Sequence, residues 1–433
     1  MQNGPSTKRD RDNNKKERLL SKDYVLLMSS SFSVAMINHF FLAVMPLYIA
    51  YIGGSTMIAG FFISFYALAA LAIRPVAGIL SDKYGRCKLI IIGAAVISVF
   101  SFCNAFIVVI PVLLVIRMIQ GLGFGLQSTS ANAAAADVVP KSRLAEGIGY
   151  FTLYSTVAQA IGPSIALAIV AGDTMKDYQT LFFVSAAVCA AGATAGSLIT
   201  YERKRKLLAV RAGECTEKSR ATTQDRLPAI SDTPLPKTLL GFEYAVFVPM
   251  AAIMLFNIAL VSVFGFLAPY ARWRGLTNPG LFFTISAMGV VVSRMIVGRI
   301  VDKRGADVIV IPSLAVLAGS LMLFSIVESR VAFFILALPI GLSQGALMPT
   351  FNTMIFRRCS PARRGTAAGA YFTAIDMGYV VGAPLLGALA DAMDFRYIYW
   401  AAVVFAMLSL LLYLLACSDK RYNARILKSN KTS

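Results

Sequence analysis

Three ionisable side chains lie inside long apolar stretches of the 433-residue sequence. Asp376 and Arg117 have mostly apolar neighbours on both sides, and His39 is the one histidine in the chain. A carboxyl group removed from water favours its neutral form, which suits it to carrying a proton. An imidazole changes charge close to neutral pH. We therefore expect Asp376 or His39 to take up a proton. We expect Arg117 to face a polar cavity, because a guanidinium in apolar surroundings is costly.

Each of these residues also has an interpretation without proton transfer. Asp376 could anchor a cationic substrate, or could be a static partner for a Ser, Thr or Tyr on a neighbouring helix. Arg117 could belong to a structural network with Gln120, three residues further on. A lone buried histidine such as His39 is more often a hydrogen-bonded packing residue. One histidine excludes a multi-histidine metal site and argues against a Ser-His-Asp hydrolase, so we expect no metal and no enzyme activity.

Amide side chains at similar depth in the apolar stretches could line a substrate cavity. They could equally join helices by hydrogen bonds, which contribute about 0.6 kcal/mol each on average. The candidate cavity residues are Asn38, Gln120, Gln127, Gln159, Asn257, Gln344 and Asn352.

Long apolar helices must position all of these side chains. Hydrophobic residues make up 57% of the chain and charged residues 15%, whereas ordinary soluble domains carry about 25% charged residues. A helix that spans a bilayer needs about 20 mostly apolar residues. We therefore expect an all-α integral membrane protein of twelve helices, with the lipid bilayer as a partner. The expected helices cover residues 24–50, 54–80, 88–107, 108–137, 143–171, 178–200, 241–270, 278–301, 308–328, 330–357, 364–390 and 395–417.

The formal net charge of +19 is distributed unevenly. Of the 41 Lys and Arg residues, 32 fall in the two tails and in the connections on one side of the expected bundle. This positive-inside bias predicts that both termini are cytoplasmic in a multi-pass protein of the cell membrane. Binding to nucleic acid would require the basic residues to cluster on a folded, water-facing surface, so we expect no such partner.

The helices divide into two similar halves. We expect a basic tail at 1–23, a six-helix half at 24–200, a polar linker at 201–240, a second half at 241–417 and a basic tail at 418–433. The stretch from Arg74 to Gly85 recurs 220 positions later, from Arg294 to Gly305, with five identities. Two such halves with Gly and Pro interruptions at corresponding places are typical of a repeat-built secondary transporter.

The connection between the second and third helices carries the most specific motif. It contains Gly78, Asp82, Lys83, Gly85 and Arg86. In this pattern the chain resembles the major facilitator superfamily, and the resemblance covers essentially the whole sequence. The family usually has a second basic residue at the position of Cys87, and here Lys88 follows one place later. The resemblance implies two six-helix halves that alternate access to a central cavity.

The resemblance also implies that this loop is a conformational latch between the halves. Asp82 would then lie against Arg363, Arg364 and the start of the eleventh helix. Asp302 belongs to the second copy of the motif, where Ala306 replaces the basic residue after Gly305. The alternative is a basic cluster that only fixes topology.

Two further motifs point to one branch of this family. Arg117 opens a segment with Gln120, Gly121 and Gly123 that is similar to the fourth-helix motif of proton-driven members, which implies a part for Arg117 in proton coupling. The pair Gly162 and Pro163 resembles the core of the antiporter motif on the fifth helix. At three other positions of that motif, where the family has glycines more often, the chain has Ala158, Ala166 and Leu167.

We therefore expect a monomeric, proton-coupled antiporter that exports a small amphipathic compound. The chain contains no Gly-x-x-x-x-Gly-Lys-Ser/Thr loop, so we expect no ATP site and no cofactor. One alternative is an uptake symporter for a metabolite or sugar. An alternative of another class is a membrane receptor built on a transporter scaffold that carries no substrate across the membrane.

Overall fold

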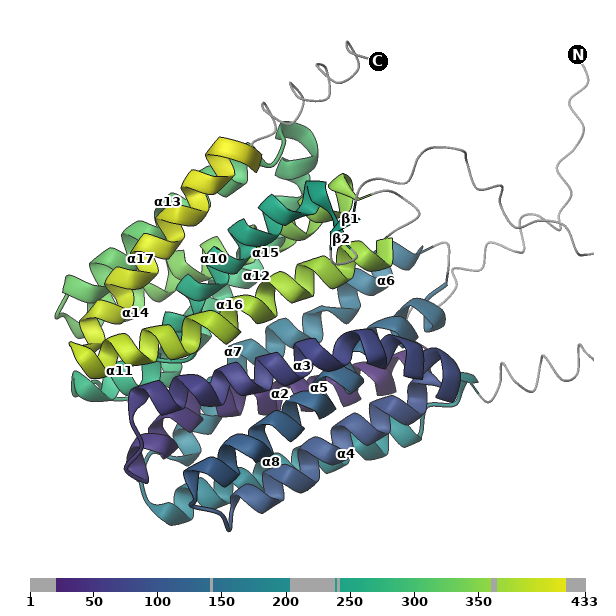
Figure 1. The fold of residues 1–433 in the computed structure, drawn as a ribbon, viewed down its shortest axis with the longest axis horizontal. Coiled ribbons are helices and arrows are strands. Elements are labelled where there is room, and N and C mark those ends of the chain that lie inside the picture. The colour runs from purple at the N-terminus through teal and green to yellow at the C-terminus, as the bar shows by residue number, and fades with distance from the viewer. Residues whose placement is uncertain (1–20, 141–142, 203–237, 240–241, 360–363, 418–433) are drawn as a thin grey trace, which may run out of the picture.

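The computed structural model describes residues 21–140, 143–202, 238–239, 242–359 and 364–417 (Figure 1). Within these residues, twelve helical segments are long and apolar enough to cross a membrane, which confirms the predicted all-α fold class. Most of the predicted linker and tails lies outside the described residues. The twelve segments pack as two groups, one purple to blue and the other green to yellow in Figure 1.

Among the described residues, the first group contains seven helices that make six spans, because α6 and α7 follow each other with one residue between them. Its helices are α2 (Lys22–Tyr51), α3 (Thr56–Tyr84), α4 (Arg86–Asn104), α5 (Ile110–Val138), α6 (Leu144–Phe151), α7 (Leu153–Ile169) and α8 (Met175–Ser197).

The second group begins after a short antiparallel pair, β1 (Thr238–Leu239) and β2 (Phe242–Glu243). Its helices are α10 (Tyr244–Phe264), α11 (Leu267–Trp273), α12 (Gly280–Arg304), α13 (Asp307–Ile326), α14 (Arg330–Ile335), α15 (Ala337–Arg358), α16 (Arg364–Ala392) and α17 (Phe395–Leu412), which ends in a π-helical turn at Tyr413–Cys417. The helix predicted at 241–270 is thus interrupted, since α10 ends at Phe264 and α11 begins at Leu267.

Local sequence signals account for where several helices begin and end. The Ser55 hydroxyl accepts a hydrogen bond from the Ile58 amide and so caps α3, and Thr174 and Asp177 form a capping box on α8. Gly85 and Gly305 end the matching helices α3 and α12 with φ angles of 99° and 85°. A side chain at either position would be strained, so the repeated glycine reflects a repeated backbone turn.

The most extensive contacts between the two halves are those of α3 with α16 and of α7 with α12. Figure 1 shows α16 lying along α3 at the boundary between the groups. We call the end of the bundle with the turns at Gly85 and Gly305 the basic end, after Lys83, Arg86 and Lys303 in those turns. The other end, with the turns at residues 52–55 and 170–174, is called the opposite end.

Candidate functional site

The two halves are packed tightly together at the opposite end. A Cβ on Gly60 of α3 would lie 2.7 Å from the carbonyl carbon of Ala383 and 2.8 Å from the Cα of Pro384, both on α16. A Cβ on Gly280 of α12 would lie 2.8 Å from the Cα of Ser164 on α7. These distances are too short for any side chain, so the close approach of both helix pairs depends on glycine.

Polar contacts join the halves at the same end. The carboxylate of Asp391 on α16 accepts hydrogen bonds from the backbone amides of Thr56 and Met57, at 2.8 and 2.7 Å. These amides begin α3, where a negative charge is favourable. Asp173, in the turn before α8, forms an ion pair with Arg272 of α11. The opposite end is therefore closed by both packing and charge.

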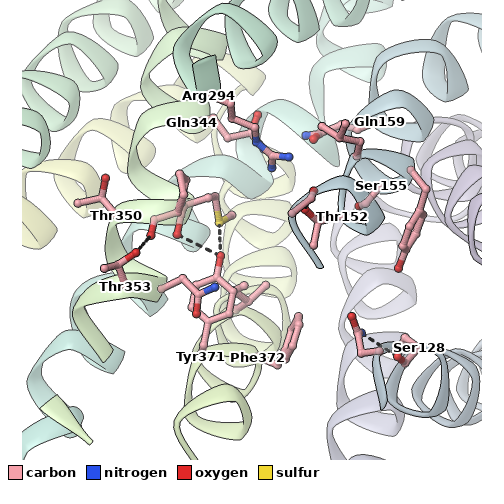
Figure 2. A pocket seen from close by; sticks show the side chains of 18 of the residues that line it. Ser128, Thr152, Ser155, Gln159, Arg294, Gln344, Thr350, Thr353, Tyr371 and Phe372 are labelled. Carbon is pink, nitrogen blue, oxygen red and sulfur yellow. Dashed lines mark hydrogen bonds between the residues drawn. The ribbon is translucent and has the colours of Figure 1, made fainter. Parts of the chain in front are cut away.

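A cavity of about 810 Å³ separates the halves between mid-depth and the basic end. His39 marks its inner part, while Val301 in the last turn of α12 and Thr353 near the end of α15 lie on its wall toward the basic end. Figure 2 shows polar side chains from both halves, among them Gln159 and Gln344, pointing into this space. A cavity open toward one end and closed at the other corresponds to one state of an alternating-access cycle.

The structure places the candidate cavity amides in two groups. Gln159, Gln344 and Asn352 line the cavity, as does His39. The others do not line it, and three of them make contacts within or between helices. Gln120 Nε2 donates to Ser101 Oγ at 3.3 Å, Gln127 Nε2 to Ser31 Oγ at 3.2 Å and Asn257 Nδ2 to the Ile253 carbonyl at 2.9 Å. Asn38 is not part of the cavity wall.

Asp376 has an arginine partner from the other half of the molecule. The Arg74 Nε donates to Asp376 Oδ2 at 2.8 Å, and Arg74 Nη2 lies 3.5 Å from Oδ1. Arg74 belongs to α3 and lines the cavity, whereas Asp376 belongs to α16 and is 8% exposed. The Arg74 guanidinium also lies 4.9 Å from the centre of the Phe372 ring. The ion pair thus connects the halves at the cavity wall.

Arg117 is 2% exposed and is surrounded by aromatic rings. Its guanidinium lies 3.9 Å from the ring centre of Tyr66 and 5.3 Å from that of Phe41, and it donates to Gln120 Oε1 at 3.3 Å. No carboxylate contacts Arg117 in the described part of the chain, so the basic partner of Asp376 is Arg74. Among these residues Tyr66 contacts Arg117 directly.

His39 and the antiporter-like pair lie together. A Cβ on Gly162 of α7 would be 3.1 Å from His39 Cβ on α2, so the glycine brings these helices into close contact. Pro163 lies within α7 and is buried. His39 Nδ1 is buried without a hydrogen-bond partner among the described residues. Gly162 therefore has a packing role between α2 and α7, and a proton relay through His39 stays a prediction.

The expected latch residues lie apart from the second half. Asp82 is 77% exposed in its side chain and lies 3.7 Å from Arg86 of its own half. Arg86 also pairs with Asp137, and Lys83 lies beside the Tyr84 ring. A Cβ on Gly78 would meet nothing within 4 Å. Arg363 lies outside the described residues, as do the side chains of Arg364 and Asp302, so the latch stays a prediction.

The roles of Arg74 and of its repeat counterpart, Arg294, were not predicted from the sequence. Arg294 of α12 lines the cavity and donates to the Thr156 hydroxyl of α7, so it also connects the halves. The available signal was the repeat itself, because an arginine kept at matching positions of two apolar helices is costly unless it has a polar role.

Comparison with known proteins identifies the family. The model of the Major Facilitator Superfamily matches residues 27–376 and 276–431. The Staphylopine export protein of Staphylococcus aureus is 22% identical over 384 residues, which are 87% of this chain and 90% of that protein. Multidrug resistance protein 1 of Bacillus subtilis is 23% identical over 355 residues, or 80% and 83% of the two chains.

Solved structures support the same fold. The nucleoside transporter NupG superposes with a TM-score of 0.66 at 14% identity, over 91% of this chain and 98% of that one. A D-xylose-proton symporter gives 0.68 at 15% identity, over 90% and 95%. With a family model that matches most of its length, this chain belongs to the major facilitator superfamily and is a multi-pass membrane transporter of small molecules rather than an enzyme.

Proposed function

We propose that the protein is a proton-coupled antiporter of the cell membrane that exports a small amphipathic compound. The basic end and both termini face the cytoplasm in this proposal, because Lys and Arg concentrate in the connections at that end. The cavity of this state would then be open to the cytoplasm, where an exporter loads its substrate. The names of two relatives, an export protein and a multidrug resistance protein, agree with this direction.

The ion pair between Arg74 and Asp376 carries the proposal of proton coupling. It joins the halves across the α3–α16 contact, so separation of the two helices there is opposed while the pair is intact. A proton on Asp376 removes the negative charge and weakens this connection. Arg117 would affect the pair through Tyr66, which it contacts directly. Asp376 is the primary proton carrier in this scheme, with His39 as the second candidate.

The glycines indicate how the second state would form. Those at the opposite end, such as Gly60 and Gly280, are in close contact, whereas the repeated glycines Gly78 and Gly298 near the basic end have no atom within 4 Å of a Cβ. Closure of the basic end in another state would explain these two glycines, because other helices could then approach them closely. Closure there would bring Asp82 to the start of α16, as the latch requires.

Transport in everted membrane vesicles tests the function. An imposed pH gradient, acidic inside, should drive uptake of fluorescent amphipathic compounds in vesicles that contain the protein. Asp376→Asn should abolish the dependence on the gradient, and Glu328→Gln, an exposed acid 79% accessible in its side chain, is the matched control. Accumulation by intact cells would indicate the uptake symporter, and no flux in proteoliposomes would indicate the receptor.

Asp376→Asn could also act by leaving Arg74 without a charged partner. Calorimetry in buffers of different ionisation enthalpy separates the two effects, because it counts the protons released when a substrate binds. We expect release by the native protein and by Glu328→Gln, and none by Asp376→Asn. Proton release by Asp376→Asn equal to that of the native protein would remove this residue from the coupling step.

A further inference from the structure

The cavity has an excess of positive charge. Two arginines, Arg74 and Arg294, line it, and none of the described lining residues is Asp or Glu. Asp376 neutralises Arg74 from behind the cavity wall. Arg294 has no carboxylate partner among the described residues, and the Thr156 hydroxyl occupies only one of the five N–H donors of its guanidinium. One arginine charge inside the bundle is therefore left uncompensated.

The internal repeat shows that the excess positive charge lies on one side of the cavity. Arg74 and Arg294 occupy matching positions, shifted by 220 residues. Around Asp376 the shift is 221 residues, because Tyr371, Phe372 and Thr373 match Tyr150, Phe151 and Thr152. Asp376, the partner of Arg74, therefore corresponds to Ser155 in the first half, next to the Thr156 that bonds Arg294. The two cross-half bridges thus differ in charge, with an acid in one and a hydroxyl in the other. An uncompensated arginine at membrane depth is costly unless a ligand or a polar cavity completes its surroundings.

We propose that the substrate carries an anionic group, such as a carboxylate, which binds Arg294. Figure 2 shows Arg294 directed into the same part of the cavity as Gln344 and Gln159. The fork of a guanidinium matches a planar carboxylate, and amide groups can complete its hydrogen bonds. Gln344 Oε1 is buried without a partner, so this amide is free to turn its donor toward the anion.

The rest of the cavity fits an apolar or aromatic body. Phe124, Tyr154, Phe372 and Tyr379 line it, with Met348 as an adaptable apolar neighbour. Rings of this kind bind flat apolar groups by stacking and by edge contacts. A lipophilic cation would meet these rings together with an unpaired arginine, so the cavity favours an amphipathic anion over an amphipathic cation.

This proposal rests on the proposed function, because it takes the cavity to be the transport site. The anion site on α12 and the proton site on α16 lie at different helix contacts, α7 with α12 and α3 with α16. An anion at Arg294 therefore does not compete with Asp376 for Arg74, and the protons released on substrate binding come from molecules in which Asp376 is protonated. Exchange of one outgoing monovalent anion for one incoming proton then moves two charges across the membrane.

Binding to the purified full-length protein in lipid nanodiscs tests the site without transport. The probes are 1-naphthoate, the neutral 1-naphthamide and the cationic 1-naphthylmethylammonium, which share one aromatic body. We expect 1-naphthoate to bind most tightly in calorimetry. Arg294→Gln should weaken its binding about 10- to 100-fold, as expected for loss of a charged hydrogen-bond partner. Arg294→Lys should retain part of the affinity, and Arg396→Gln, an exposed arginine at the opposite end, should retain all of it.

Thr156→Val provides a test of opposite sign. It removes the hydroxyl that Arg294 contacts and leaves the guanidinium intact, so 1-naphthoate should bind at least as tightly as to the native protein. The proposal is overturned if 1-naphthoate does not bind, if the amide or the ammonium binds equally well, or if Arg294→Gln binds 1-naphthoate normally. Binding without proton-driven flux would instead overturn the proposed function and leave the anion site standing.

Discussion

A single methyl group added at Gly60 should open the end of the bundle that is closed here. The new Cβ would lie 2.7 Å from the Ala383 carbonyl carbon and 2.8 Å from Pro384 Cα. Both atoms belong to the backbone of α16, so no side chain can turn away and the two helices must separate. Overpacking of this kind costs about 1–3 kcal/mol. Gly60→Ala should therefore shift the equilibrium away from this state by about 5- to 150-fold.

Gly78→Ala is the matched control, since it adds the same methyl group to the same helix. Alanine stabilises either helix position by about 1 kcal/mol relative to glycine, so this contribution is common to both variants. A Cβ at Gly78 meets nothing within 4 Å in this state. If the basic end closes around Gly78 in the other state, Gly78→Ala should leave this state unchanged or favour it.

Thiol labelling measures the shift. In a background without native cysteines, Ser64→Cys places a thiol one turn beyond Gly60 on α3, where the native side chain is 5% exposed. A membrane-impermeant maleimide added from the opposite end should label this thiol faster in Gly60→Ala and no faster in Gly78→Ala. Equal labelling rates in the two variants would refute the assignment of Gly60 to closure of that end.

Three other outcomes are expected. Arg74→Gln, which removes the charge, should uncouple transport from the pH gradient, as expected for Asp376→Asn. Normal gradient-driven flux by reconstituted Arg74→Gln would contradict a role of the Arg74–Asp376 ion pair in coupling. Export of a monovalent anion in exchange for a proton should be electrogenic, with the membrane potential contributing about 2.3 kcal/mol per charge per 100 mV. A flux that does not change when valinomycin imposes a potential would contradict this charge balance. Burial raises the pKa of Asp173, but hydrogen bonds from Arg272 and Tyr178 outweigh it and hold that pKa below its ordinary value. The ion pair should therefore be intact above the ordinary aspartate pKa of about 3.9 and be lost only as the pH falls through the lowered value. In the Asp376→Asn background, labelling at the opposite end relative to that of a free thiol at the same pH should be constant from pH 8 to 5 and rise only in stronger acid.

The architecture could be read from the sequence because it depends on local patterns. Apolar runs of about 20 residues have few alternatives to spanning a membrane, and their number needs no knowledge of tertiary contacts. The repeat around Gly85 and Gly305 was visible because a backbone turn with positive φ restricts the residue type. The short break between α10 and α11 was not predicted, since a single glycine, Gly265, inside a long apolar run does not by itself end a helix.

The site was only partly predictable from the sequence. The direction in which a side chain points, and the residues that it contacts, depend on how the two halves pack against each other. Gln120 and Gln159 are the same residue type at similar depth, yet Gln120 is packed with Arg117 and Gln159 lines the cavity. Asp376 was identified because a carboxyl group in an apolar helix is energetically unfavourable. Its partner Arg74 is 302 positions away, and no local pattern connects the two.

The comparison of the two halves nevertheless explains why both arginines are present. A duplicated helix pair would place an arginine bridge on each side of the cavity, at Arg74 and at Arg294. With an acid in both bridges, the cavity would be neutral and proton uptake could occur at either wall. With Asp376 on one side and Ser155 next to Thr156 on the other, one bridge can titrate and the other cannot. The same difference leaves Arg294 available to a substrate, so a single departure from symmetry separates the proposed proton site from the proposed anion site.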